Sequence, residues 1–193
     1  MPDMLSFFTF SLLAIFTPGP NNIMALGNAG RHGFKKSLPF NFGVAVGFLL
    51  VLAASVAFSA ALYGVLPQVK PWMAAIGAAY MLYLAYKTLR SKPHGQAEGK
   101  EHISFLSGVV LQFINPKGVL FGITVAANYI TPYYHTLPPI AALAMALAVL
   151  TVGSTCSWAA FGAMFQRFLA KRQTAFNIVM ALLLVYCAVS LFL

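Results

Sequence analysis

Residues 11–27 read SLLAIFTPGPNNIMALG, an apolar helical stretch interrupted in its middle by prolines, a glycine and two asparagines. Pro18 and Pro20 have no amide hydrogen, so the carbonyls of Ala14 and Phe16 lose their helical partners. The residue before each proline is also pushed away from helical angles. The stretch therefore predicts a helix that opens at its prolines and resumes after them.

The chain around this interruption is apolar enough to lie in a membrane. Its 193 residues are 60% hydrophobic and 8% charged, whereas soluble domains have about 45–50% apolar and about 25% charged residues. About 20 apolar residues span a bilayer, and by this measure the spans are expected at 5–27, 39–63, 71–89, 103–129, 138–164 and 175–193. The sequence thus predicts an all-α polytopic membrane protein with six transmembrane helices.

The basic residues lie in short loops between the apolar segments. Ten of the twelve Lys and Arg residues fall in the loops after the first, third and fifth segments, so the net charge of +9 does not form a face for nucleic acid. Such loops remain cytoplasmic by the positive-inside rule. The sequence therefore predicts a multi-pass protein of the bacterial inner membrane with both termini in the periplasm.

A second interruption lies 98 residues after the first, in the stretch FINPKG at 113–118. An offset of 98 places Leu13 on Leu111 and Pro18 on Pro116, in the first helix of each half of the chain. Three helices per half make the second half enter the membrane from the opposite side. This is the inverted-repeat plan of many transporters, in which interrupted helices mark the binding site.

The organisation expected from this offset is one integral membrane transporter domain over 1–193. It comprises repeat one at 1–90, a polar cytoplasmic linker at 91–102 and repeat two at 103–193, with proline-interrupted helices 1 and 4. In lipid, freed backbone groups must be satisfied by protein, water or a ligand, so both interruptions should face a cavity. One alternative stays open: helix 4 dips in as a re-entrant pair, which would move the C-terminus to the cytoplasm.

Lys117 is the one charge expected deep in the membrane. It lies about 14 residues, or roughly 21 Å, from one end of its span, and intramembrane charges usually line substrate or ion pathways. A substrate carboxylate would bind near Lys117, and a substrate ammonium near freed carbonyls and amide oxygens. No Asp or Glu lies in any predicted span, which leaves Lys117 as the candidate titrating group if transport is proton-coupled. The predicted substrate-binding residues are Thr17, Pro18, Gly19, Pro20, Asn21, Asn22, Gln112, Asn115 and Lys117, with Asn21 and Asn22 capping the resumed helix.

Other positions carry weaker expectations. Asn41, Tyr80 and Tyr83 are predicted as secondary lining, although an aromatic stripe is more often packing. Gly43 and Gly47 form a G-x-x-x-G pair that lets two helices approach closely. The two cysteines, Cys156 and Cys187, belong to no C-x-x-C pair and are expected as buried apolar residues without a disulfide or a metal. No cofactor is expected.

Three stretches resemble the LysE/RhtB family of amino-acid exporters: TPGPNNIMALGNAGRHGFKKS (17–37), FINPKG (113–118) and FNIVMALLLVYCAV (176–189). The similarity covers the whole chain, and its C-terminal part, with FQRF at 165–168, most resembles the branch that exports cysteine and O-acetylserine. The resemblance implies efflux of a small neutral amino acid from the cytoplasm, driven by the proton motive force, and no enzymatic activity. Protons and membrane lipids are the implied partners, and a homodimer is compatible with it.

Alternatives remain at this point. Within transporters, the runner-up is export of homoserine, threonine or a branched-chain amino acid, and lysine is disfavoured because the predicted spans lack acidic residues. A membrane redox protein would need paired cysteine motifs, and a channel would need rings of charge or a carbonyl filter.

Overall fold

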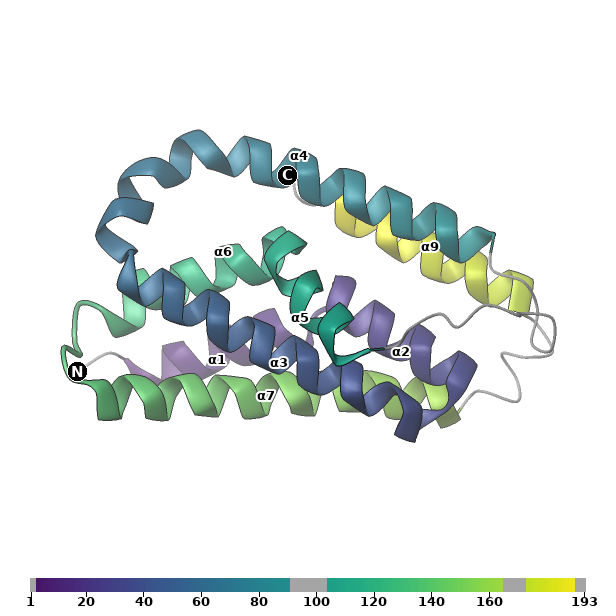
Figure 1. The fold of residues 1–193 in the computed structure, drawn as a ribbon, viewed down its shortest axis with the longest axis horizontal. Helices are drawn as coiled ribbons and strands as arrows, with labels where there is room; N and C mark the ends of the chain where they lie inside the picture. Colours follow the sequence, from purple (N-terminus) through teal and green to yellow (C-terminus); the bar gives the residue numbers. More distant parts are fainter. Residues whose placement is uncertain (1–2, 91–103, 165–172, 190–193) are drawn as a thin grey trace.

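The computed structural model describes residues 3–90, 104–164 and 173–189, without the side chains at 60–67, 69, 70, 73, 173 and 176. All regular elements within these ranges are helical (Figure 1). They are α1 (Met4–Phe16), α2 (Pro20–His32), α3 (Phe34–Ala57), α4 (Ser59–Leu89), α5 (Phe105–Ile114), α6 (Pro116–Val125), the π-helical turn η1 (Ala126–Ile130), α7 (Leu137–Met164) and α9 (Gln173–Val189). The predicted linker at 91–102 lies outside the described residues.

Several of these helices have the length and composition of membrane spans. Among the described residues, α3 and α7 are each long and apolar enough to cross a bilayer, and α5 with α6 and η1 forms a third such stretch that is bent by 72°. Shorter apolar helices cover Met4–Phe16 and Asn177–Val189. The prediction of an all-helical membrane protein is confirmed, while the arrangement as two inverted three-helix repeats stays a prediction.

The predicted boundary between the second and third spans is wrong. A loop was expected between 39–63 and 71–89, but α3 ends at Ala57 and α4 continues through that region from Ser59 to Leu89. The loop was expected because residues 64–70, GVLPQVK, are less apolar than the segments on either side. A more polar stretch does not require a helix to end. Helix α4 contains Pro67 and Pro71, and each of them removes only one backbone donor. Figure 1 shows that α4 curves over its first half and does not break.

The two ends of the molecule differ in charge. The described basic residues at the C-terminal end of α2, the start of α3 and the C-terminal end of α4 lie at one end of the bundle, away from the N-terminus (Figure 1). These residues are Arg31, Lys35, Lys36, Lys87 and Arg90. The helical arrangement thus gathers these five described basic residues at one end of the bundle.

Glycines allow the helices next to both breaks to approach their neighbours closely. A Cβ added to Gly43 of α3 would lie 1.9 Å from the Phe105 carbonyl oxygen of α5, and one added to Gly108 would lie 2.3 Å from the Phe40 oxygen. A Cβ on Gly162 of α7 would lie 2.2 Å from the Leu26 oxygen of α2. The close approach expected from Gly43 and Gly47 is therefore present, and it fixes α5 against α3.

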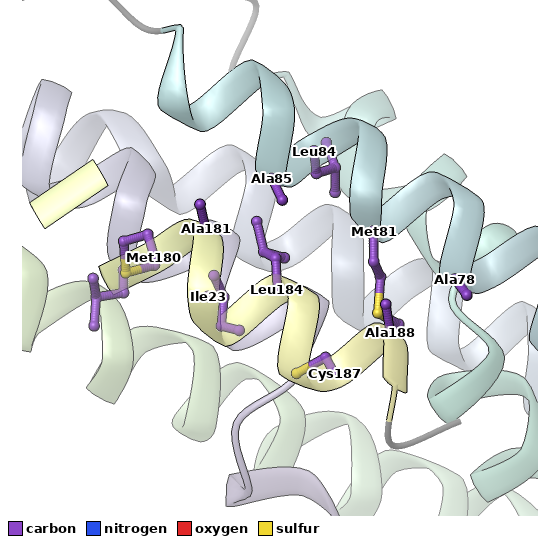
Figure 2. Close-up of a cluster of buried hydrophobic side chains, with 11 residues drawn as sticks. Ile23, Ala78, Met81, Leu84, Ala85, Met180, Ala181, Leu184, Cys187 and Ala188 are labelled. Atoms are coloured by element: carbon purple, nitrogen blue, oxygen red, sulfur yellow. The ribbon is translucent and has the colours of Figure 1, made fainter. Parts of the chain in front are cut away.

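The helices α4 and α9 lie side by side and pack on α2 through a buried apolar cluster (Figure 2). Met81 and Leu84 of α4 meet Leu184 of α9 and Ile23 of α2 there, and Cys187 lies in the same cluster. Burial of side chains of this size contributes about 1.5–3 kcal/mol each in soluble proteins, whereas in lipid the gain comes from close packing. The cluster holds α9 against the segment just after the first break.

Candidate functional site

The first break covers three residues between α1 and α2. Thr17 ends α1 with φ −60° and ψ 146°, Gly19 precedes α2 in an extended conformation, and Pro20 is the first residue of α2. The proline tolerates this position because a first-turn amide has no helical partner. The helix therefore opens where the sequence predicts, at Thr17–Gly19.

The expected capping by Asn21 and Asn22 is wrong. Gly19 is the N-cap of α2, with no side-chain hydrogen bond, and the Asn22 side chain points back instead. Its Nδ2 donates to the carbonyls of Ile15 (2.8 Å) and Thr17 (3.0 Å). The physical reason is that the end of α1 has acceptors without helical donors, and Asn22 lies close enough to supply one.

Helix α7 supplies further donors to the open end of α1. Ser154 Oγ donates to the Ile15 carbonyl at 3.0 Å, and Trp158 Nε1 donates to the Phe16 carbonyl at 3.3 Å. The Ser154 hydroxyl also lies 3.2 Å from Asn22 Oδ1. These bonds satisfy two carbonyls at the open end of α1, that of Ile15 and that of Phe16, and the second is one of the two that the prolines free.

Lys117, from the second break, reaches into the first. Its Nζ donates to the Thr17 carbonyl at 3.0 Å and to the Pro18 carbonyl at 3.4 Å. Gly19 makes room for it, since a Cβ there would lie 3.1 Å from Lys117 Cδ and 3.2 Å from Nζ. A cation at this place also meets the negative end of the α1 dipole. The two interruptions, 98 residues apart, therefore form one site.

The second break is shorter than the first and covers one residue, Asn115. Asn115 ends α5 with φ −80° and ψ 101°, and α6 begins at Pro116, at the bend of 72°. Pro116 sits against Gly77 of α4, where a Cβ would lie 2.3 Å from Pro116 Cγ. The absence of a side chain at Gly77 thus lets α4 pack directly on this bend.

Three amide side chains join the breaks. Asn21 Nδ2 donates to Gln112 Oε1 at 2.7 Å, and Asn115 Nδ2 donates to Asn21 Oδ1 at 3.1 Å and to Gln112 Oε1 at 3.3 Å. Asn115 is 3% exposed, and its Oδ1 has no hydrogen-bond partner among the described residues. An acceptor buried without a partner is costly, so this oxygen is available to a donor from a ligand.

A cavity of about 50 Å³ lies between these groups. At roughly 10–15 Å³ for each water, it has room for about four water molecules, which suits a small solute. Its walls combine both breaks with residues of α1, α3, α6 and α7. They are Ala14, Ile15, Gly19, Pro20, Asn21, Asn22, Phe48, Gln112, Asn115, Lys117, Gly118, Phe121, Thr151 and Thr155.

Most of the predicted site residues meet here. Gly19, Pro20, Asn21, Asn22, Gln112, Asn115 and Lys117 line the cavity, and Thr17 and Pro18 contribute the carbonyls that hold Lys117. The residues predicted as secondary lining are not among those that line this cavity. Asn41 is fully buried with its Nδ2 3.6 Å from Cys156 Sγ, while Tyr80 and Tyr83 line a different cavity.

Some groups at the site were not predicted as part of it. Thr151, Ser154 and Thr155 of α7 lie at the cavity or at the end of α1, and Cys187 Sγ lies 3.9 Å from the Pro18 carbonyl. The sequence shows that these polar residues lie in an apolar helix, but their spacing does not indicate that they lie next to the end of α1. Cys187 carries no sequence pattern that would have placed it here.

Apolar spans around a small polar cavity, with an amino group held at two broken helices, define a membrane transport protein. The comparisons agree with this class: the model of the LysE type translocator family matches residues 12–193. The chain belongs to this family, so it is a transporter and not an enzyme, and it is a multi-pass protein of the inner membrane.

Several named relatives are similar over their full length. The cysteine/O-acetylserine efflux proteins of Escherichia coli (strain K12) and Shigella sonnei (strain Ss046) are each 39% identical over 195 residues, which cover 99% of this chain and 98% of each relative. The protein of the same name from Escherichia coli O139:H28 is 38% identical over the same share. No solved structure matches the chain.

Proposed function

We propose that the protein exports small zwitterionic amino acids, cysteine and O-acetylserine among them, from the cytoplasm, and that the two joined breaks are the transport site. The observation that carries this proposal is the position of Lys117, whose Nζ lies 3.0 Å from the Thr17 carbonyl at the wall of a small polar cavity. The names of the relatives support cysteine and O-acetylserine as substrates.

Both charges of such a substrate have partners in the cavity. The carboxylate pairs with the Lys117 ammonium, since charge-assisted hydrogen bonds are the strong ones. The substrate ammonium replaces Lys117 at the Thr17 and Pro18 carbonyls and donates to Asn115 Oδ1, which has no partner among the described residues. The substrate thus provides a new partner for Lys117 and for both carbonyls that Lys117 leaves.

The same exchange couples substrate binding to the shape of the site. Lys117 now connects the start of α6 to the end of α1. When the substrate carboxylate draws Lys117 away from the carbonyls, the two breaks lose this direct connection. We propose that this loosening lets the breaks move between a state open to the cytoplasm and one open to the periplasm, with substrate binding favouring the change through differential affinity.

We propose the proton motive force as the energy source. Among the described residues that line the cavity, Lys117 is the charged one. The chain has three acidic residues, and Asp3, the one that the structure describes, does not line the cavity. The coupled proton would enter from the periplasm and leave to the cytoplasm as the substrate moves outward.

The decisive experiment is transport in proteoliposomes that contain the purified protein and labelled O-acetylserine. We expect efflux that is accelerated by an imposed proton gradient and competed by cysteine, with homoserine, threonine and leucine as weaker competitors. Loss of the gradient by protonophore should reduce efflux to the passive rate. Efflux equal to that of empty liposomes for every substrate would overturn the proposal, and preferred transport of threonine or leucine would assign the runner-up substrates.

A further inference from the structure

A second and larger cavity lies along α2 beyond the transport site. It has a volume of about 200 Å³ and is walled by α2, α3, α4, α5 and α9. We call it the vestibule. Its polar wall is formed by Asn28, Arg31, Tyr80, Tyr83, Lys87, Thr88 and Ser107.

Two cations from different helices face this vestibule. Arg31 lies in the last turn of α2 and Lys87 in the last turn of α4. An Arg guanidinium binds a carboxylate with two parallel hydrogen bonds, and a Lys ammonium adds a point charge. The hydroxyl and amide groups of Asn28, Tyr80 and Thr88 surround them with further hydrogen-bonding capacity. The composition of this wall suits a small anion.

The vestibule adjoins the transport site. Ile23 and Leu111 line the vestibule, whereas the preceding residue of α2, Asn22, and the residue after Leu111, Gln112, line the transport cavity. Ile23 is 1% exposed and Leu111 is 2% exposed, so a thin apolar layer separates the two cavities. Arg31 is eleven residues beyond Pro20 on the same helix, about 16 Å along its axis.

Arg31 and Lys87 of the vestibule lie in the last turns of α2 and α4, and these helix ends lie at the end of the bundle away from the N-terminus (Figure 1). If export begins at that end, a substrate reaches the vestibule before it reaches Lys117. Basic clefts with apolar walls concentrate anions and accelerate their association. An amino acid passing this way would meet a cation for its carboxylate at both stages.

We propose that the vestibule is a separate capture site, in which Arg31 and Lys87 bind the carboxylate of the amino acid on its way to Lys117. This proposal rests on the proposed export function. It assigns to the vestibule a substrate-binding role distinct from that of the two breaks. Binding there depends on the carboxylate alone, whereas binding at the breaks uses both charges of the zwitterion.

The test is transport into inside-out membrane vesicles, with O-acetylserine and the competitor added at the basic-loop side. N-acetylglycine, a carboxylate without an ammonium, is the probe of the vestibule. For the wild-type protein we expect N-acetylglycine to raise the apparent KM of O-acetylserine only when it is added at this side. In the double variant Arg31→Gln/Lys87→Gln the KM without competitor should rise about 10-fold, the maximal rate should stay within about two-fold, and the inhibition should disappear.

Two variants separate this effect from misfolding and from general charge loss. Lys36→Gln removes an exposed cation at the same end of the molecule and should leave KM and inhibition unchanged. Arg31→Lys keeps the charge and should hold KM within about three-fold of the wild type. If the double variant does not fold, the single variant Lys87→Gln replaces it in the test, and we expect its KM for O-acetylserine to rise about three-fold.

An anionic lipid headgroup has the same chemistry as a carboxylate, so the assay is repeated in proteoliposomes with and without phosphatidylglycerol. We expect the effects of Arg31→Gln/Lys87→Gln in both. An effect confined to phosphatidylglycerol vesicles would mean that the vestibule binds lipid and would overturn the proposal. Normal transport with unchanged KM and inhibition in the variants would also overturn it while the export function stands, and absence of transport by the wild type would refute both.

Discussion

Lys117 is the residue on which the proposed transport chemistry depends. Its Nζ donates to the Thr17 and Pro18 carbonyls, but each of these acceptors has a second donor close by, Asn22 for Thr17 and Cys187 for Pro18. After removal of the ammonium, the Thr17 and Pro18 carbonyls therefore each keep a hydrogen-bond donor. It also removes a charge whose burial is costly, so the fold should tolerate the loss.

We accordingly expect Lys117→Met to reduce export of O-acetylserine about 10- to 100-fold without lowering the thermal unfolding midpoint. A hydrogen bond to a charged group contributes about 1.5–3 kcal/mol, which corresponds to that range of rates. Initial efflux from proteoliposomes and thermal unfolding in detergent provide the two measurements. Lys36→Met, which alters an exposed lysine, should preserve both, and normal efflux by Lys117→Met would contradict the proposed role.

Asn115 offers a test of the other end of the substrate. Its Oδ1 is buried without a partner in the described part of the chain, and we propose that the substrate ammonium donates to it. Asn115→Leu removes this acceptor at similar size, so we expect KM for O-acetylserine to rise about 10-fold. Asn128→Leu is the matched control because Asn128 is exposed and its side chain donates to the Thr124 carbonyl of the preceding turn at 2.9 Å. An equal rise in both variants would argue against a specific contact.

At the scale of elements, the contact between α3 and α5 positions the second break. Gly43 allows no added Cβ, because it would lie 1.9 Å from the Phe105 oxygen. Gly43→Ala should therefore force α5 away from α3, and overpacking of this kind costs about 1–3 kcal/mol. We expect a lower thermal unfolding midpoint together with reduced transport. Gly153→Ala on α7, where nothing lies within 4 Å of the added Cβ, should leave the midpoint unchanged or raise it slightly.

The elements also show what the sequence could and could not predict. Proline chemistry predicts the break at Thr17–Gly19 because it acts on the nearest backbone groups, and apolar length predicts α7 almost to the residue. The direction of the Asn22 side chain and the continuation of α4 through 64–70 were not predictable in this way. Both depend on which acceptors and helices lie nearby in space. The meeting of Lys117 with Thr17 likewise depends on the crossing of α5 and α3.

At the scale of the whole molecule, the described basic residues outside the transport site, apart from Lys70 within α4, form a strongly polarised distribution. Arg31, Lys35, Lys36, Lys87 and Arg90 lie at one end, and the N-terminus lies at the other (Figure 1). Basic loops stay in the cytoplasm, so the vestibule should open to the cytoplasm and the N-terminus should lie in the periplasm. This orientation is the one that export requires if capture precedes transport.

The location of the C-terminus then depends on the bent pair of α5 with α6 and η1. If this pair crosses the membrane in spite of its 72° bend, both termini lie in the periplasm; if it dips in and returns, the C-terminus lies in the cytoplasm. We predict a full crossing, because α7 starts at the end of the bundle near the N-terminus and finishes at the basic end (Figure 1), so its preceding connection must already be on the periplasmic side. Alkaline phosphatase fused after Leu193 should be active, and green fluorescent protein fused there should be dark. A fusion after Arg90 should behave oppositely, and a fluorescent C-terminal fusion would instead establish the re-entrant path.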